Sequence, residues 1–300
     1  MLSPIYAALI LIWSTTPLAI QWSSGGVTAL FGVTGRMLIG TLLCLVLLII
    51  SGDRLPLHRQ ALQAYAAAAI GLYGSMICVY WGAQFIPSGL VSVLFGLTPV
   101  FTALFATLQL QERSGPQQWF GMALGLAGLA LLFHQSLSDQ RIAADGVLVV
   151  LVAVILNALS MVMVKARNQG LSTLALTSGG LSLALPLYLM TWWLLDGNWP
   201  ADIPTRTWGS ILYLGIVGSV IGFMLFFHVL GRARANQVAL ITLITPLTAL
   251  WIGHLFNGES LSPLSWLGTM TILSGLVIHQ WHIIIRRSAP QPLASTRPED

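Results

Sequence analysis

Charged side chains are scarce in this chain. Asp, Glu, Lys and Arg make up 7% of its 300 residues, whereas hydrophobic residues make up 56%. A typical soluble domain carries about 25% charged residues, so these few charges cannot cover the outside of a water-soluble protein of this size. The composition excludes a soluble globular fold and indicates that lipid surrounds the protein.

Cysteine is also scarce, and long basic runs are missing. The two cysteines, Cys44 and Cys78, each lie inside an apolar run and form no CxxC or metal-binding spacing. This pattern favours two buried apolar side chains over a disulfide or a zinc centre, so we expect no metal and no cofactor.

The net charge of +4, without a basic run, indicates membrane orientation rather than nucleic-acid binding. Met1 to Ser3 lack the basic region of a cleavable signal peptide.

Long apolar runs dominate the rest of the sequence. A helix needs about 20 mostly apolar residues to cross a hydrocarbon core of about 30 Å, and ten segments meet this requirement. They cover approximately residues 4–22, 28–50, 62–83, 89–110, 116–134, 146–164, 173–195, 208–230, 236–256 and 264–285. The predicted fold class is therefore an all-α membrane protein with ten transmembrane helices. Residues 286–300 contain three prolines and are expected to form a disordered cytoplasmic tail.

The distribution of Lys and Arg predicts the orientation, because cytoplasmic loops carry an excess of these residues. Arg141 and Arg206 lie in the odd-numbered loops, and Arg36 lies inside a span. The other ten of the 13 basic residues lie in the even-numbered loops and the tail. We therefore expect both termini in the cytoplasm and a multi-pass protein of the plasma membrane, which in a bacterium is the inner membrane.

An internal repeat relates the two halves at a shift of 147 residues. The matching pairs are Thr98-Pro99 and Thr245-Pro246, Glu112 and Glu259, Pro116 and Pro263, Trp119 and Trp266, Gly121 and Gly268, and Gly128 and Gly275. Five spans per copy is an odd number, so the second copy must enter the membrane from the opposite side. We expect two inverted five-helix repeats, residues 1–135 and 146–285, as in transporters that rock around a midplane site.

Residues 80–128 resemble the EamA-type repeat of the drug/metabolite transporter superfamily. The resemblance rests on the mid-span Thr98-Pro99 pair, the Glu112-Arg113 turn and the spaced glycines Gly121, Gly125 and Gly128. Residues 233–275 repeat the pattern with Ser260 in place of the Arg. The stretch from Leu11 to Thr15 resembles the first-helix signature, with Ser14 where Gly is more usual.

This resemblance implies a ten-helix transporter with cytoplasmic termini and a central cavity lined mainly by helices 1, 3, 4, 6, 8 and 9. Members of the family mostly export amino acids, other metabolites or toxic compounds, and this chain is most similar to the amino-acid and metabolite exporter branch. Family membership by itself does not define the substrate.

Ionisable residues are nearly absent from the spans. Every Asp and Glu lies in a loop, at a helix end or in the tail, which disfavours a carboxylate proton relay and leaves downhill or exchange transport as the default. Any proton coupling would depend on histidine, but His134, His228 and His254 lie near helix ends, where an interfacial role explains them. Arg36 is either a substrate-binding charge or a structural one that snorkels or bonds backbone carbonyls.

Polar and aromatic residues in mid-span predict the lining of the cavity. The candidates share helix faces and are Trp13, Pro17, Gln21, Tyr73, Tyr80, Phe95, Thr98, Asn157, Ser160, Thr242 and Thr245. Among them Asn157 is the best single candidate, because an amide at this depth needs a polar partner. Pro99 and Pro246 interrupt two repeat-related helices and are either hinges or plain kinks.

Together these residues favour a carrier that exports small metabolites such as amino acids, including aromatic or hydrophobic ones. An aromatic box could instead hold a quaternary amine or a toxic organic cation by cation–π attraction. An intramembrane enzyme is a distant alternative, because Gly74-Ser75 and Thr177 to Gly179 belong to no catalytic motif, so we expect no enzyme. The expected partners are a small-molecule substrate and the lipid bilayer. The Gly121-x-x-x-Gly125 face favours packing within a monomer, while the oligomeric state stays open.

Overall fold

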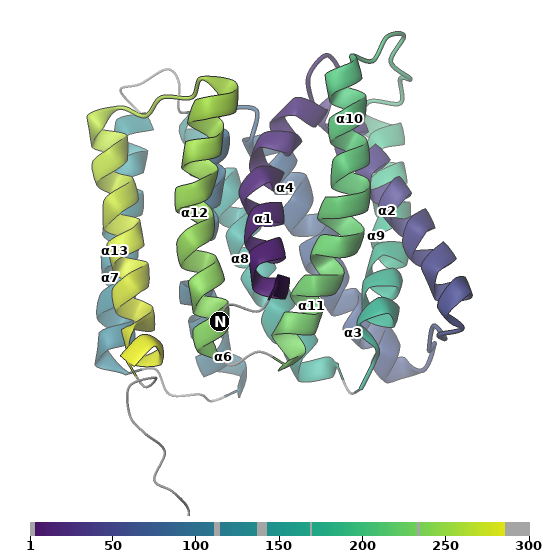
Figure 1. The fold of residues 1–300 in the computed structure, drawn as a ribbon, viewed down its shortest axis with the longest axis horizontal. Helices are drawn as coiled ribbons and strands as arrows, with labels where there is room; N and C mark the ends of the chain where they lie inside the picture. The colour runs from purple at the N-terminus through teal and green to yellow at the C-terminus, as the bar shows by residue number, and fades with distance from the viewer. Residues whose placement is uncertain (1–3, 111–114, 137–142, 169, 233–234, 286–300) are drawn as a thin grey trace, which may run out of the picture.

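The computed structural model describes residues 4–110, 115–136, 143–168, 170–232 and 235–285. Within these ranges the chain is helical and contains no strand. Figure 1 shows the helices lying side by side, with α7 and α13 paired at one edge and α2, α3 and α9 gathered at the other. The predicted tail, the Glu112-Arg113 turn and Arg141 lie outside the described residues.

The helices follow the apolar runs of the sequence. Their bounds are α1 Pro4–Ser23, α2 Ala29–Ser51, α3 Arg59–Ala69, η1 Ile70–Ser75, α4 Met76–Gly82, α5 Ser88–Phe95, α6 Thr98–Leu110, α7 Pro116–Ser136, α8 Ala144–Arg167, α9 Thr173–Leu195, α10 Thr205–Tyr213, η2 Leu214–Ile221, α11 Gly222–Arg232, α12 Ala235–Asn257 and α13 Pro263–Ile285. Seven helical segments of the described chain are long and apolar enough to cross a membrane. The remaining three predicted spans coincide with α7, α12 and α13.

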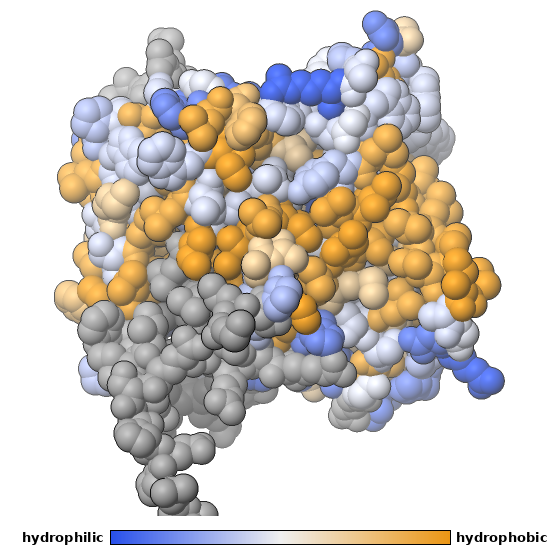
Figure 2. Space-filling view, viewed as in Figure 1, coloured by the Kyte–Doolittle hydropathy of each residue, from blue (hydrophilic) through white to orange (hydrophobic). Residues whose placement is uncertain are grey.

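The outer surface is suited to lipid. Figure 2 shows hydrophobic residues across the middle of the visible face and hydrophilic residues towards its two ends. Large apolar side chains stand exposed on several helices, including Ile49, Leu195 and Trp251. Exposed apolar surface on this scale is unfavourable in water but matches a hydrocarbon environment. The chain is therefore a multi-pass membrane protein.

Helices α7 and α13 cross in antiparallel fashion through glycine. A Cβ atom added to Gly121 would lie 2.6 Å from the Gly275 carbonyl oxygen, and one added to Gly128 would lie 2.7 Å from the Gly268 carbonyl oxygen. Only glycine permits backbones to approach this closely. A Cβ atom on Gly275 would also lie 2.6 Å from the Gly125 nitrogen, so the predicted Gly121-x-x-x-Gly125 face packs inside the bundle.

Two π-helical segments interrupt otherwise continuous α-helices. The segment η1 joins α3 to α4, and η2 joins α10 to α11. Both contain the pattern Gly-x-x-Gly-Ser, at residues 71–75 and 215–219. Because η1 packs on α8 and η2 packs on α2, the glycines bring each π segment close to its neighbour. Single-turn π segments are frequent at functional sites.

The predicted span 89–110 is divided in two. Helix α5 ends at Phe95 and α6 begins at Thr98, so the expected mid-helix Pro99 lies in the first turn of a new helix, where its missing N–H has no cost. Its repeat mate Pro246 lies inside the uninterrupted helix α12. A Cβ atom on Gly96 would lie 3.6 Å from the Pro246 Cγ atom. The break between α5 and α6 therefore lies next to Pro246. The two repeat-related prolines do not form two equivalent kinks.

Candidate functional site

A cavity of about 160 Å³ lies at the centre of the bundle. Its walls come from α1, α2, α4, the α5–α6 region, α8, the η2–α11 region and α12. Eight of the residues singled out from the sequence line it, namely Trp13, Pro17, Arg36, Phe95, Thr98, Asn157, Thr245 and Pro246. Residues from both halves of the chain therefore meet around one space.

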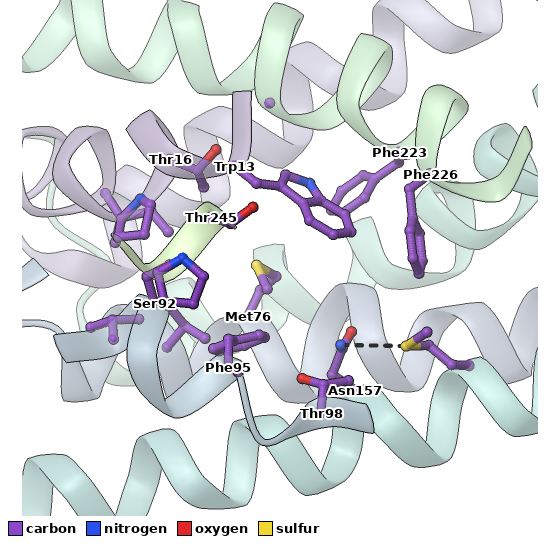
Figure 3. Close-up of a pocket in the computed structure, with 18 of the residues that line it drawn as sticks. Trp13, Thr16, Met76, Ser92, Phe95, Thr98, Asn157, Phe223, Phe226 and Thr245 are labelled. Atoms are coloured by element: carbon purple, nitrogen blue, oxygen red, sulfur yellow. Dashed lines mark hydrogen bonds between the residues drawn. The ribbon is translucent and has the colours of Figure 1, made fainter. Parts of the chain in front are cut away.

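Aromatic rings form much of the cavity wall. The ring centroids of Trp13 and Phe226 are 5.1 Å apart at an interplanar angle of 51°. Figure 3 shows Trp13 beside Phe223 and Phe226, with Phe95 and Asn157 across the cavity. Such rings offer a large apolar surface of defined shape to a bound solute.

The cavity has few polar groups, and these differ in whether they have a strong hydrogen-bond partner in the protein. The hydroxyls of Thr16 and Thr245 donate to the carbonyl oxygens of Ile12 and Ile241 in their own helices, at 2.6 and 2.7 Å. The Asn157 amide nitrogen, in contrast, makes its one hydrogen bond among the described residues to the soft Sδ atom of Met161, at 3.8 Å (Figure 3). A sulfur is a weak acceptor, so the Asn157 amide retains hydrogen-bonding capacity for a solute.

Thr98 lies next to Asn157 in the view of Figure 3. Its buried Oγ1 atom has no hydrogen-bond partner among the described residues. A buried hydroxyl is unfavourable when it is left without a partner. Thr98 and Asn157 therefore both offer neutral polar groups to the cavity that they line.

Other residues predicted for the cavity lie outside its wall, because packing partners take up their polar atoms. The Tyr73 and Thr191 hydroxyls form a 2.6 Å hydrogen bond, and Ser160 Oγ donates to the Ala67 carbonyl oxygen at 2.8 Å. Tyr80 is buried, and Ser23 Oγ donates to its hydroxyl oxygen at 3.5 Å. The side chain of Thr242 lies outside the described residues.

Gln21 and Tyr80 border a second hollow with Ser24, Ala83 and Gln84, beside the ends of α1 and α4. The Gln21 amide nitrogen donates to the Ala83 and Ile86 carbonyl oxygens at 3.1 and 2.8 Å. These bonds tie α1 to the connection between α4 and α5. Gln21 therefore closes one end of the bundle instead of lining the central cavity.

Glu259 extends this closure across the same end. Its Oε2 atom accepts a 3.2 Å hydrogen bond from the Gly89 backbone N–H in the first turn of α5. The Asn257 amide nitrogen donates to Glu259 Oε1 at 3.0 Å and to Gln21 Oε1 at 3.2 Å. A carboxylate at a helix N-terminus is favourable. Glu259 therefore links α5 to α12, and Asn257 extends the link to α1. The sequence had shown Glu259 as a loop residue and as the repeat equivalent of Glu112.

Several cavity residues were not predicted from the sequence. Met76, Met161, Phe223 and Phe226 resemble ordinary apolar core residues, and Ser92 and Gly218 carry no distinctive chemistry. The repeated Gly-x-x-Gly-Ser pattern was the available signal for Gly218, since it marks both π segments.

Arg36 in α2 is the one cationic residue of the cavity wall, and the lining contains no Asp or Glu. It is 1% exposed. Its Nε atom donates to Ser219 Oγ at 2.8 Å, and its Cζ atom lies 5.9 Å from the centroid of the Phe223 ring. Its Nη1 atom is buried and has no hydrogen-bond partner among the described residues.

Comparison with known proteins relates the chain to transporters. The EamA-like transporter family matches residues 3–134 and 144–279. An uncharacterized transporter, YoaV of Bacillus subtilis, is 25% identical over 272 residues, which cover 90% of this chain and 93% of the relative. A probable amino-acid metabolite efflux pump of Salmonella typhimurium is 28% identical over 230 residues, covering 72% and 76%.

A solved crystal structure shares the fold. It superposes with a TM-score of 0.67 at 19% sequence identity and covers 93% of this chain and 97% of its own. At this identity the likeness shows the architecture alone.

Proposed function

The chain belongs to the EamA-like transporter family, and from that membership we propose an alternating-access carrier that exports small metabolites, amino acids or related compounds with an apolar or aromatic part. The central cavity carries this proposal, because Trp13 and Phe95 of the first half face Phe226 and Thr245 of the second around one space. A solute held between two halves can be exposed to either side when one half tilts against the other.

The proposal includes ten membrane helices in two inverted halves, residues 1–135 and 146–285. Its support is the reciprocal contact between α7 and α13. At the 147-residue shift Gly121 corresponds to Gly268, and Gly128 to Gly275. Gly121 contacts Gly275 while Gly128 contacts Gly268. Gly121 thus packs against the repeat equivalent of Gly128, and Gly128 packs against the repeat equivalent of Gly121. A two-fold relation between the halves requires this exchange.

The cytoplasmic location of both termini is supported by the excess of Lys and Arg in the even-numbered loops. In that orientation the network of Gln21, Asn257 and Glu259 closes the external end of the pathway. We further propose the break between Phe95 and Thr98, which lies beside Pro246, as the hinge.

Related proteins named as amino-acid metabolite efflux pumps support this substrate class. The aromatic wall would also suit a quaternary amine, but Arg36 places a positive charge in the same wall, and like charges repel. An intramembrane enzyme finds no support in the described contacts, since Ser178 Oγ donates to the Cys44 carbonyl oxygen rather than to a histidine.

An exchange assay in proteoliposomes tests the proposed function. Liposomes that contain the purified protein are loaded with an unlabelled amino acid, and uptake of the labelled form is followed for a panel of amino acids. We expect uptake above protein-free liposomes for at least one apolar or aromatic amino acid, lost in Trp13→Ala. Trp193→Ala is the matched control, because Trp193 is 71% exposed on the outer surface. Uptake equal to that of protein-free liposomes across the panel would refute transport of amino acids.

A further inference from the structure

Neither ordinary structural role of an intramembrane arginine accounts for all the donors of Arg36. A snorkelling arginine extends its guanidinium to the interface, but Arg36 is 1% exposed. An arginine that locks helices together directs its five N–H donors at carbonyls or carboxylates. Among the described residues the Arg36 side chain instead makes one hydrogen bond, from Nε to Ser219 Oγ, and Nη1 is buried without a partner there.

The segment η2 builds the pocket around the guanidinium. Gly218 leaves room for it, since a Cβ atom there would lie 3.3 Å from Arg36 Nη2. Ser219 fixes the Nε side, and Phe223 lies one turn further along with its ring 5.9 Å from Cζ. The arrangement orients the planar group and leaves Nη1 for another acceptor.

The charge of Arg36 has no counter-charge in the cavity. None of the lining residues is acidic, and a buried charge is unfavourable unless it is paired. A carboxylate is the natural partner, because its two oxygen atoms match the guanidinium fork. A phosphate fits less well, since one cation cannot balance a dianion within apolar walls.

We propose that Arg36 binds the carboxylate of the transported solute and that the site prefers organic monoanions with an apolar or aromatic body. This inference rests on the proposed transport function. The aromatic side of the cavity receives the body, while Thr98 and Asn157 receive a neutral polar group such as a keto or hydroxyl oxygen. An ammonium group gains no ionic partner here, so a monoanion binds more tightly than the corresponding zwitterion, and a cation binds least.

Three solutes that share one skeleton test the charge preference. Isothermal titration calorimetry of the purified full chain at pH 7 compares 3-phenylpropanoate, phenylalanine and phenethylamine, which are an anion, a zwitterion and a cation. We expect the anion to bind about tenfold tighter than phenylalanine, and phenethylamine to bind weakest. In Arg36→Gln we expect the affinity for the anion to fall about tenfold or more and the preference to disappear.

Arg206→Gln is the matched control, because it removes the same charge from an exposed arginine that stacks on Trp22 outside the cavity. The order of the three affinities in the wild-type chain tests the preference for the anion even where Arg36→Gln does not fold. Phenylalanine or phenethylamine binding as tightly as the anion, no binding of any of the three, or full anion affinity in folded Arg36→Gln would overturn the inference.

The amino-acid exchange assay separates this inference from the transport function. Exchange without a preference for the anion would overturn the role of Arg36 and leave the carrier. Binding of the anion that depends on Arg36, without flux of any solute, would overturn the carrier and leave the anion site.

Discussion

Gly121 and Gly275 meet where α7 crosses α13, and a Cβ atom on Gly121 would stand 2.6 Å from the Gly275 carbonyl oxygen and 2.5 Å from the His279 backbone nitrogen. Both neighbours are backbone atoms, which cannot move aside as a side-chain tip can. The two helices therefore depend on glycine at this crossing.

The first prediction follows from this crossing. Gly121→Ala should force α7 and α13 apart and lower the free energy of unfolding by about 1–3 kcal/mol, the usual cost of overpacking. Thermal unfolding of the detergent-purified protein measures the loss. Gly209→Ala is the control, because Gly209 is a helical glycine with nothing within 4 Å of an added Cβ. Equal melting temperatures for the two variants would contradict the close crossing.

The second prediction concerns the end of the bundle held by Glu259. Glu259→Ala removes the acceptor for the Gly89 N–H and for the Asn257 amide, a loss of about 1 kcal/mol that opens this end about fivefold more often. Alkylation of Ser24→Cys, in a chain with Cys44 and Cys78 replaced by alanine, should accelerate accordingly. Asp202→Ala serves as the control, since Asp202 is an exposed loop carboxylate. An unchanged alkylation rate in Glu259→Ala would show that the hydrogen bonds of Glu259 do not keep this end of the bundle closed.

The third prediction compares two repeat-related threonines. Thr245 Oγ1 donates to the Ile241 carbonyl oxygen, whereas Thr98 Oγ1 has no partner among the described residues. Thr98→Val should therefore leave the free energy of unfolding unchanged or raise it, and should weaken solute binding about fivefold. Thr245→Val should lower the free energy of unfolding by up to about 1 kcal/mol. Unfolding and titration of both variants provide the test, which fails if Thr98→Val destabilises the protein as much as Thr245→Val does.

The fourth prediction concerns the π segment η1. The Tyr188 hydroxyl donates to the Leu72 carbonyl oxygen at 2.7 Å and thereby supports the irregular backbone. Tyr188→Phe should lower the free energy of unfolding by about 1 kcal/mol. Tyr65→Phe is the matched variant, because the Tyr65 hydroxyl is buried without a partner among the described residues, and its removal should be neutral or stabilising. Thermal unfolding of Tyr188→Phe and Tyr65→Phe measures the difference. A Tyr65→Phe variant less stable than Tyr188→Phe would refute this role for Tyr188.

Much of the fold could be predicted, because a span is encoded locally by a run of apolar residues. The expected segment 28–50 became α2, Ala29–Ser51, and the expected segment 236–256 became α12, Ala235–Asn257. The break at Gly96 was not predicted from the sequence; it follows α5, which packs against α12, an element far away in the sequence. The π segments η1 and η2 likewise pack against distant helices, α8 and α2.

The candidate site was only partly accessible to sequence reasoning. Polar residues in mid-span were easily identified, but whether each faces the cavity depends on which partner takes its hydrogen bond. Ser160 and Asn157 lie on the same helix face, yet Ser160 bonds the Ala67 carbonyl oxygen while Asn157 lines the cavity. The phenylalanines of α11 carried no signal, because an apolar ring facing a solute resembles one facing lipid.

The segment η2 has a consequence for the geometry of everything that follows it. A π turn holds one residue more than an α turn, so it rotates the chain beyond it by about 100° about the helix axis. The orientation of Phe223 and Phe226 is thus set by that surplus residue rather than by their own identity. Removing one residue between Leu214 and Ile221 would leave the composition of α11 intact while swinging both rings away from Trp13, so the length of this stretch matters as much as the residues in it.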